Sequence, residues 1–357
     1  MLKSLLLAVG WLAAILAGSV ALCLAVISIR PSMSAPWKRG RVVDVVSTRA
    51  TPPPSPAPAP EGADPYPSSR IAFDRTRAGR LYAAAWVSED GGRTWRPLAS
   101  DGSSVRLLGG TQALAPAPGP DGRLLVSGVL FEEPGVATGL GAIARAAEWR
   151  NGGWAPFGST APDTELIDKW SDLRARAIGY TPDGTAVIAA AQEIATSDGR
   201  SWPTPGRLRS ALVSATGAIY AAISDSGRFG LYRADTLGAP WMPLAGAGAV
   251  DALAETAGAI LVVSSSRLGR LQRGQWRWTD LPSTVRPREL AAHPTQPLVA
   301  LWGEGRLLIS ADGGMQFRES QLGFEIDWAA WDPFTADTLT LVERDGRAHV
   351  LSLRSLP

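Results

Sequence analysis

The feature that most constrains the fold is an octamer that recurs along the chain. Its fullest copy is Ser88-Glu89-Asp90-Gly91-Gly92-Arg93-Thr94-Trp95. An Asp placed two residues after a Ser can turn its carboxylate onto the backbone N–H groups of a turn. The two glycines can supply the positive φ that closes a tight hairpin, and the tryptophan opens the next strand with a large apolar face. The octamer therefore predicts a self-contained β-turn between two strands.

Further copies of the octamer keep its acidic and aromatic positions. The second full copy spans residues 310–317, with Phe in place of the tryptophan, and a copy at residues 196–202 lacks one residue. A more degenerate copy spans residues 232–241. We predict a structural role in these turns for Ser88, Asp90, Gly92, Thr94, Trp95, Asp198, Trp202, Asp235, Trp241, Ser310, Asp312, Gly314 and Phe317.

The spacing of the copies predicts a repeat architecture. With two fainter copies that end at Trp154 and Trp278, the closing aromatic residues are separated by 59, 48, 39, 37 and 39 residues. A period near 40 residues is typical of propeller blades. Apolar runs such as Leu298–Trp302 and turn signals such as Pro182-Asp183-Gly184 recur between the copies, which favours six or seven blades of short strands.

The octamer, which reads Ser-x-Asp-x-Gly-x-Thr-Trp, resembles the Asp-box, or BNR repeat, of sialidase-like and sortilin-like propellers. The resemblance implies an all-β fold, a six- or seven-bladed β-propeller over residues 70–357. In that family these turns lie at the periphery of the blades, away from the ligand face. Asp90 and Asp312 are therefore expected to be structural rather than catalytic.

An apolar segment precedes the repeats. Residues Ser4–Ile29 form an uncharged run of 26 residues, which exceeds the roughly 20 that a helix needs to cross a bilayer. We interpret residues 1–30 as one N-terminal transmembrane helix, an uncleaved signal anchor in the lipid bilayer. A cleaved signal peptide, with the mature chain starting near Ala35, is the alternative.

The orientation of this anchor rests on two opposing signals. More basic residues follow the apolar run than precede it, and the positive-inside rule alone would then place the propeller in the cytoplasm. A run that starts at residue 4 and a Pro-rich spacer after it are typical of exported proteins. We expect a single-pass membrane protein with a periplasmic or extracellular propeller.

Residues 31–69 are interpreted as a linker. Within it, residues 51–60 read Thr-Pro-Pro-Pro-Ser-Pro-Ala-Pro-Ala-Pro and predict a stiff polyproline II spacer. Residues 41–47, Arg-Val-Val-Asp-Val-Val-Ser, are rich in β-branched side chains and predict a short strand. That strand could close the last blade of the propeller, because a ring leaves no sheet edge exposed.

The composition offers little for metal or nucleic-acid chemistry. The net charge is +2, which gives no long-range field that would attract nucleic acid. The only cysteine, Cys23, lies in the apolar segment, and His293 and His349 are the only histidines. We therefore expect no nucleic-acid partner, no metal and no cofactor.

The sequence leaves enzymatic activity undecided and favours a non-catalytic protein. A sialidase needs an arginine cluster, a Tyr–Glu nucleophile and an early Arg-Ile-Pro signature, whereas the chain has Arg70-Ile71-Ala72. Another glycosidase would need two carboxylates that face each other across a cleft. The acid-rich segments that could supply them are residues 130–140 and 161–174.

These two segments account for the long steps of 59 and 48 residues. Loops beyond about 12 residues in a compact domain are usually functional or disordered. An aromatic side chain among charges suits a partner interface, although a solvated loop has the same composition. The candidate binding residues are Phe131, Glu132, Glu133, Glu165, Asp168, Trp170 and Asp172.

Two functional hypotheses follow. The first is a membrane-anchored, non-catalytic β-propeller that acts as a protein-binding or complex-assembly scaffold for a membrane or periplasmic protein partner. Its plan is similar to that of the Asp-box propellers of photosystem II stability and assembly factors. The alternative is an exported glycoside hydrolase or glycan-binding propeller. The two differ in whether carboxylates from both insertions converge on one pocket.

Overall fold

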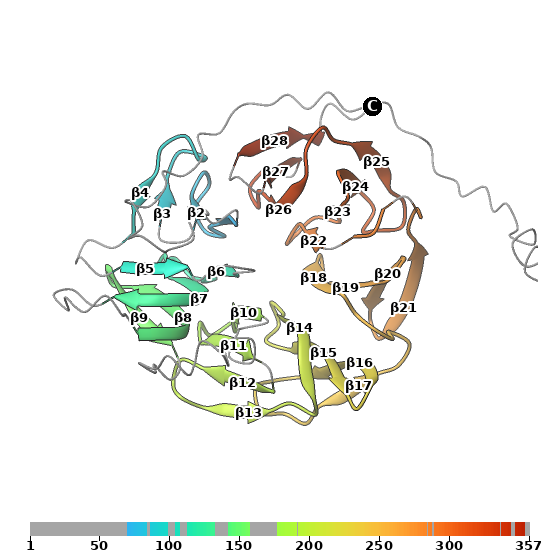
Figure 1. The fold of residues 1–357 in the computed structure, drawn as a ribbon, viewed down its shortest axis with the longest axis horizontal. Helices are drawn as coiled ribbons and strands as arrows, with labels where there is room; N and C mark the ends of the chain where they lie inside the picture. Colours follow the sequence, from blue (N-terminus) through green and yellow to red (C-terminus); the bar gives the residue numbers. More distant parts are fainter. Residues whose placement is uncertain are drawn as a thin grey trace, which may run out of the picture. The chain divides into compact units, whose positions relative to one another are not determined.

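The computed structural model describes residues 70–83, 86–98, 104–107, 113–132, 142–157, 177–190, 192–283, 285–287, 289–335, 337–343 and 347–353. The chain divides into two units, Met1–Lys38 and Arg39–Pro357, and all of the described residues belong to the second unit. They form seven antiparallel sheets, the blades, which stand around a ring (Figure 1).

Each blade takes its strands from one stretch of the chain. Blade 1 holds β1 (Ala72–Phe73), β2 (Leu81–Ala83), β3 (Trp86–Ser88) and β4 (Arg96–Pro97), and blade 2 holds β5 (Ser104–Leu107), β6 (Leu114–Pro116), β7 (Leu124–Glu132), β8 (Ala142–Arg150) and β9 (Gly153–Phe157). Blade 3 holds β10 (Ala177–Tyr180), β11 (Ala186–Ala190), β12 (Glu193–Thr196) and β13 (Ser201–Pro203), and blade 4 holds β14 (Arg207–Val213), β15 (Ile219–Asp225), β16 (Arg228–Ala234) and β17 (Met242–Leu244).

The remaining three blades follow in the same way. Blade 5 holds β18 (Ala252–Thr256), β19 (Ala259–Ser264), β20 (Arg267–Gln272) and β21 (Gln275–Asp280), and blade 6 holds β22 (Glu289–Ala292), β23 (Val299–Gly303), β24 (Arg306–Ser310) and β25 (Arg318–Gln321). Blade 7 holds β26 (Ile326–Trp331), β27 (Thr338–Glu343) and β28 (Ala348–Ser352), three strands among the residues that the structure describes.

The second strands of the blades carry the most apolar sequences. β11 reads Ala-Val-Ile-Ala-Ala and β23 reads Val-Ala-Leu-Trp-Gly, and every residue of both strands is buried. Short continuous apolar runs of this kind suit strands that are covered on both faces. They are covered on both faces because each blade packs between two neighbours.

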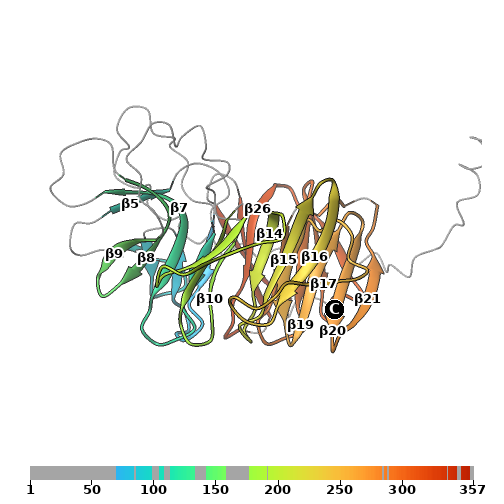
Figure 2. The same ribbon diagram turned by 90° about the horizontal axis from the view of Figure 1, so that it is seen from below.

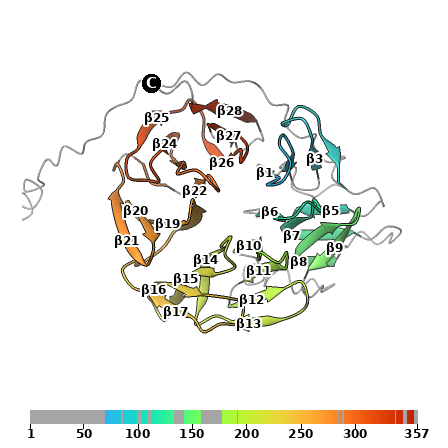
Figure 3. The ribbon, with the colours of Figure 1, turned by 180° about the vertical axis from the view of Figure 1, so that it is seen from behind.

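The inner strands close the ring. β1, β6, β10, β14, β18, β22 and β26 lie next to one another in that order, and β26 returns to β1. Figure 3 shows β26 and β1 on the two sides of this joint. At this last joint Trp328 Nε1 donates to Ile71 O at 2.8 Å. The guanidinium carbon of Arg70 lies 4.2 Å from the centre of the Trp328 ring. Residues from the first and last blades therefore tie the ring together.

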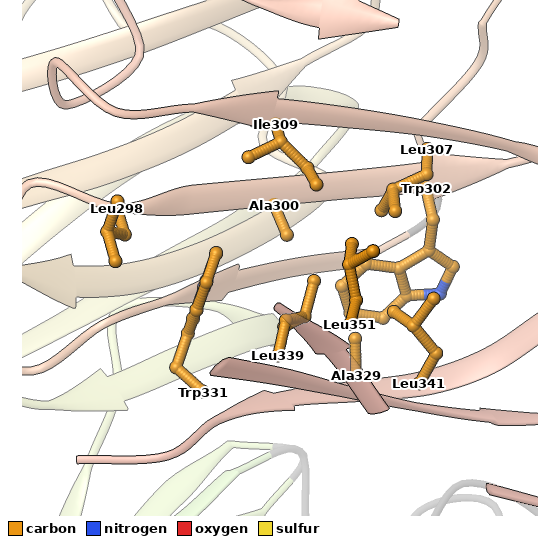
Figure 4. Close-up of a cluster of buried hydrophobic side chains, with 10 residues drawn as sticks. All are labelled: Leu298, Ala300, Trp302, Leu307, Ile309, Ala329, Trp331, Leu339, Leu341 and Leu351. Carbon is orange, nitrogen blue, oxygen red and sulfur yellow. The ribbon is translucent and has the colours of Figure 1, made fainter. Parts of the chain in front are cut away.

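The hydrophobic core is divided among the interfaces between blades. The cluster between blades 6 and 7, drawn in Figure 4, consists of Leu298, Ala300, Trp302, Leu307, Ile309, Ala329, Trp331, Leu339, Leu341 and Leu351. Trp302 is 2% exposed. Its ring meets Trp328 edge to face, with the ring centres 6.4 Å apart. This geometry is one of those that aromatic pairs prefer.

The predicted all-β propeller is confirmed, and its blade count is seven. The expected transmembrane segment Ser4–Ile29, the spacer at residues 51–60 and the possible closing strand at residues 41–47 lie outside the described residues. Over the part of the chain that the structure describes, no helix has the length and apolar character needed to span a membrane.

Candidate functional site

Blade 2 differs from the other blades in strand length and number. β7 and β8 span nine residues each. β5 pairs with Val129–Glu132, beyond the part of β7 that pairs with β6, and Figure 2 shows it at the upper edge of the blade. The spacing predicted that the residues in excess of the regular period form a loop. Part of this excess is instead regular strand. We call the edge of the ring at which β7 ends and β8 begins the insertion edge.

Two of the predicted binding residues fall within the described chain. Phe131 and Glu132 end β7, where their backbones pair with Val105 and Ser104 of β5. The other five lie outside the described residues: Glu133, Glu165, Asp168, Trp170 and Asp172. The convergence of the two acid-rich segments on one pocket therefore stays a prediction.

Strand direction brings the ends of both insertions to the insertion edge. β7 ends at Glu132 and β8 begins at Ala142. β9 runs antiparallel to β8 and ends at Phe157, and the next strand, β10, begins at Ala177. Alternate strands of an antiparallel sheet run in the same direction, so β7 and β9 both end at this edge. The chain therefore leaves the described sheet at the insertion edge after Glu132 and again after Phe157.

The octamer forms a closed turn between β3 and β4. Ser88 Oγ donates to Asp90 Oδ1 at 2.8 Å and accepts from the Gly92 N–H at 2.8 Å. Asp90 also accepts from the Arg93 and Thr94 N–H groups at 3.0 and 2.9 Å, and from Thr94 Oγ1 at 2.6 Å. Trp95 Nε1 donates back to Gly92 O at 3.1 Å. Donors from the same turn therefore satisfy the acceptor sites of the Asp90 carboxylate.

The second full copy repeats this geometry between β24 and β25. Ser310 Oγ donates to Asp312 Oδ1 at 2.7 Å and accepts from the Gly314 N–H at 2.8 Å. Gly314 has a φ of 91°, and a Cβ there would lie 2.2 Å from a methyl carbon of Leu268 in blade 5. Only glycine fits this position, because both its backbone conformation and the approach of the neighbouring blade exclude a side chain.

The shortened and degenerate copies keep parts of the pattern. In the copy of blade 3, Thr196 Oγ1 donates to Asp198 Oδ1 at 2.5 Å, and Arg200 Nη2 lies 2.6 Å from the other oxygen. In the copy of blade 4, Asp235 pairs with Arg233 at 2.7 Å. These turns join third strands to fourth strands, so they lie at the edge of the ring opposite the insertion edge. The assignment of the octamer residues as structural rather than functional stays a prediction.

Hydrogen bonding sets the charge of the octamer carboxylates. The hydrogen bond from the Thr94 side chain, followed by the one from its backbone N–H, lowers the pKa of Asp90 to about 2. The hydrogen bond from the Arg200 side chain is the main cause that lowers the pKa of Asp198. Both carboxylates are therefore ionised at neutral pH, a state that suits an acceptor in a turn and does not suit a proton donor.

Two buried tyrosines donate to carboxylates, a pairing that the sequence did not reveal. Tyr82 Oη lies 3.0 Å from Asp74 Oδ2 in blade 1, and Tyr180 Oη lies 3.1 Å from Glu148 Oε1 across the joint between blades 3 and 2. Burial, followed by the charge of the neighbouring carboxylate, raises the pKa of both phenols. A phenol with a raised pKa stays protonated, so neither pair is suited to act as a Tyr–Glu nucleophile.

Arg123 ties the second of these pairs across two blades. Its Nη1 lies 3.3 Å from Glu148 Oε1, and its Nη2 donates to Gly184 O of blade 3 at 2.9 Å. Glu148 is 3% exposed. An acidic residue that follows Ala146 and Ala147 within a strand is the sequence signal for such a buried pair.

A cavity of about 190 Å³ lies between blades 3 and 4. Trp202, Leu237 and Trp241 are among the residues that line it, and Trp241 Nε1 donates to Pro203 O at 3.2 Å. The cavity is smaller than the roughly 300–1,000 Å³ of most ligand sites. Its lining carries no titratable side chain, so its size and chemistry suit an apolar side chain better than a reacting substrate.

Among the residues that the structure describes, no group of three His, Cys, Asp or Glu side chains could bind a metal ion. His293, one of the two histidines, is 1% exposed and accepts from the Thr295 and Gln296 N–H groups through Nδ1, at 3.2 and 3.0 Å. It therefore fills the turn position that Asp74 fills in blade 1, where the carboxylate accepts from the Thr76 N–H at 2.7 Å.

Solved structures with a similar backbone are propellers. YCF48 from Cyanidioschyzon merolae aligns with a TM-score of 0.52 at 13% identity, over 80% of this chain and 94% of that protein. A structure of YCF48 bound to D1 peptide aligns with a TM-score of 0.51 at 19% identity, over 79% and 92%. The GH74 enzyme of Niastella koreensis aligns with a TM-score of 0.56 at 13% identity, over 79% of this chain and 52% of the enzyme.

Comparison of the sequence with protein-family models and with curated proteins gives no match. At identities of 13–19% the structural similarity concerns the fold alone. On that basis the chain is a seven-bladed β-propeller.

Proposed function

We propose that this chain is a non-catalytic propeller that binds a protein partner at its insertion edge and serves as an assembly scaffold held at a membrane by Ser4–Ile29. The observation that carries the proposal is the extension of blade 2. Blade 2 has a fifth strand and a hairpin of two nine-residue strands, and β9, after which the second acid-rich segment follows in the sequence, ends at the same edge. Extra structure on one edge of a regular ring supplies the contact area that a stable protein interface needs.

Two further observations favour binding over catalysis. YCF48, which shares the fold, has been solved with a bound D1 peptide, so a propeller of this kind can carry a peptide site. The buried Tyr82–Asp74 and Tyr180–Glu148 pairs are closed off by the packing of the blades. The similarity to a GH74 enzyme makes hydrolysis of a glycan the outcome that would replace the proposal.

The test uses Phe131 and Trp170, the aromatic residues of the two insertions. A photo-crosslinking amino acid placed at either position in the full chain should give one discrete adduct in native membranes, and mass spectrometry identifies the protein in it. With that protein purified, F131A/W170A should weaken binding about tenfold, roughly 1.4 kcal/mol, while the melting temperature changes little.

The matched control is Phe334. It is 46% exposed in the turn between β26 and β27, at the edge opposite the insertion edge. A crosslinker at Phe334 should give no adduct with the same protein, and F334A should bind as the unaltered chain does. Equal adducts from both edges would contradict the proposed interface, and turnover of any glycan in a panel by the unaltered chain would contradict a non-catalytic role.

A further inference from the structure

A second hairpin also rises at the insertion edge, in blade 4. β15 and β16 span seven residues each, whereas β23 and β24 of blade 6 span five. Asp225 pairs with Arg228 at the tip, and the two residues between them have positive φ, 46° at Ser226 and 81° at Gly227. Positive φ at both central residues defines the type I′ turn that suits the twist of two-residue hairpins. The hairpin therefore extends as regular strand.

This extension leaves Phe229 uncovered. In blades 3, 5 and 6, the first large apolar residue after the hairpin between the second and third strands is Ile194, Leu268 and Leu307, respectively. Each of these side chains is 1% exposed. Phe229 occupies that position in blade 4 and is 45% exposed, whereas Leu231, two residues further along β16, is 1% exposed. The longer hairpin thus lifts Phe229 out of the contact between blades 4 and 5 and leaves Leu231 in it.

The connection that leaves blade 4 at the insertion edge carries no side chain large enough to cover the aromatic ring of Phe229. Leu244, the last residue of β17, pairs with Leu231, and the chain continues as Ala245-Gly246-Ala247-Gly248-Ala249. None of these residues has a large side chain, and a Cβ added at Gly248 would meet no atom within 4 Å. This connection therefore supplies no large side chain to cover Phe229, which keeps an apolar face toward solvent.

One arginine side chain lies over the Phe229 ring, and a second arginine is its neighbour in β16. β14 contains a register shift between Leu208 and Ser210, and the residue added there, Arg209, holds its guanidinium carbon 5.3 Å from the centre of the Phe229 ring. Arg228 precedes Phe229 at the tip of the hairpin. Both arginines are exposed, and within the described ranges neither forms an ion pair. A cation that rests on an aromatic ring keeps its outer donors available to a ligand.

We propose that Arg209, Arg228 and Phe229, the blade 4 patch, bind an acidic peptide segment of the protein partner. Carboxylates of the segment pair with the two guanidiniums, which match carboxylates in a two-point geometry, and an apolar side chain between them packs on the Phe229 ring. Aromatic and Arg side chains are the groups that interfaces favour and that carry most of their binding energy. The inference rests on the proposed function and supplies the chemical class of the partner.

The position of the patch supports this assignment. The β15–β16 and β7–β8 hairpins both join second strands to third strands, so both rise at the insertion edge, and they have the longest strands of the hairpins of that type in the described chain. Blade 3 stands between them. The predicted insertion residues of blade 2 are mainly acidic, whereas the blade 4 patch is basic, so a partner with opposite charge at its two ends would bind in one orientation.

The test measures binding of a fluorescein-labelled peptide, Gly-Glu-Glu-Leu-Glu-Glu-Leu-Glu-Gly, to the full chain by fluorescence anisotropy. We expect saturable binding that weakens between about 50 and about 300 mM salt, and weaker binding of a peptide with Gln in place of Glu. R209E/R228E and F229A should each weaken binding about tenfold or more. The matched controls are R273E/R277E, which reverses two exposed arginines on the outer β20–β21 hairpin of blade 5, and F334A, and both should bind as the unaltered chain does.

Several outcomes would overturn the inference. Equal binding of the Glu and Gln peptides, or equal losses in the control variants, would show that the patch does not recognise carboxylates. Binding that arises only after Asp163, Glu165, Asp168 and Asp172 are changed to Asn or Gln would show that the chain's own acidic segment occupies the patch. If the partner crosslinked at Phe131 binds R209E/R228E normally, the patch inference fails and the proposed function stands. If no partner is crosslinked but the peptide binds the patch, the proposed function fails and the patch remains.

Discussion

Asp90 takes its hydrogen bonds from residues within four positions of it in the chain. A local motif of this kind can be predicted from sequence, because the donors and the acceptor are fixed by one turn. Tyr180 and Glu148 are 32 residues apart and meet only when blades 2 and 3 pack. No spacing in the sequence specifies that contact, and the position of Glu148 directly after two alanines is the sequence signal for it.

The lowered pKa of Asp90 predicts a pH-dependent effect on stability. Its pKa of about 2 in the folded protein lies below the value of about 3.9 for an unperturbed Asp. The carboxylate therefore stabilises the folded state above the unfolded pKa, and this contribution is lost as the pH falls toward 2. Asp90→Ala should lower the melting temperature by a constant amount between pH 5 and 8, and the difference from the unaltered chain should shrink between about pH 4 and 2.

The control is Asp90→Asn, which keeps an oxygen acceptor for the turn and removes the charge. Its loss of melting temperature should be smaller than that of the Ala variant near neutral pH. A difference between the Ala variant and the unaltered chain that stays constant down to pH 2 would contradict the role of the ionised carboxylate. A loss of partner binding without any change in melting would contradict the structural assignment of Asp90.

The strands of six blades follow the pattern that the sequence predicted, because each blade repeats a buried second strand and a turn. β5 departs from it. Its sequence, Ser-Val-Arg-Leu, is too short and too mixed to identify a strand, and it pairs with β7 because β7 runs beyond β6, its other partner on that side. The extension of blade 4 was missed for a similar reason. Asp225-Ser226-Gly227-Arg228 indicates a turn, but the length of a hairpin depends on where the neighbouring blade stops covering it.

The number of strands in blade 7 leads us to predict that a further strand pairs with it. The described residues give it three strands, whereas the other blades have four or five, and the sequence predicts a further short strand at residues 41–47. We expect residues 41–47 to pair with β28. Proline removes a backbone donor that a sheet ladder needs, so V43P/V45P should increase hydrogen exchange of the β28 amides and lower the melting temperature.

The spacer offers the control for this prediction. Ala57→Pro adds one proline to a segment that already alternates with proline, and it should change neither exchange nor melting. Unchanged exchange of β28 in V43P/V45P would contradict the pairing. Dimers of the unaltered chain that dissociate in V43P/V45P would show that the strand comes from a second copy.

The whole chain combines a ring that the structure describes with an N-terminal segment that only the sequence describes. The ring could be predicted because six aromatic residues, Trp95 to Phe317, recur at a nearly regular spacing. The use of the ring could not be predicted in the same way, because one fold serves many functions. The blade 4 patch shows why: Phe229 and Leu231 are both apolar residues of one strand, and only the packing of blade 5 makes one of them available to a partner.

We predict that Ser4–Ile29 anchors the chain at a membrane, and under the proposed function this anchor would set where the insertion edge meets a partner. The protein should stay in membranes after a carbonate wash and should keep its first residues. A charged residue at the centre of a spanning helix costs roughly 2.5–3.5 kcal/mol, so Leu16→Arg should release the chain, whereas Leu2→Arg, placed before the span, should not. Protease added to spheroplasts should degrade the propeller if it is exported, and a protected propeller would place it in the cytoplasm. A soluble mature chain that starts near Ala35 would contradict the anchor, and the partner would then have to be sought among soluble proteins.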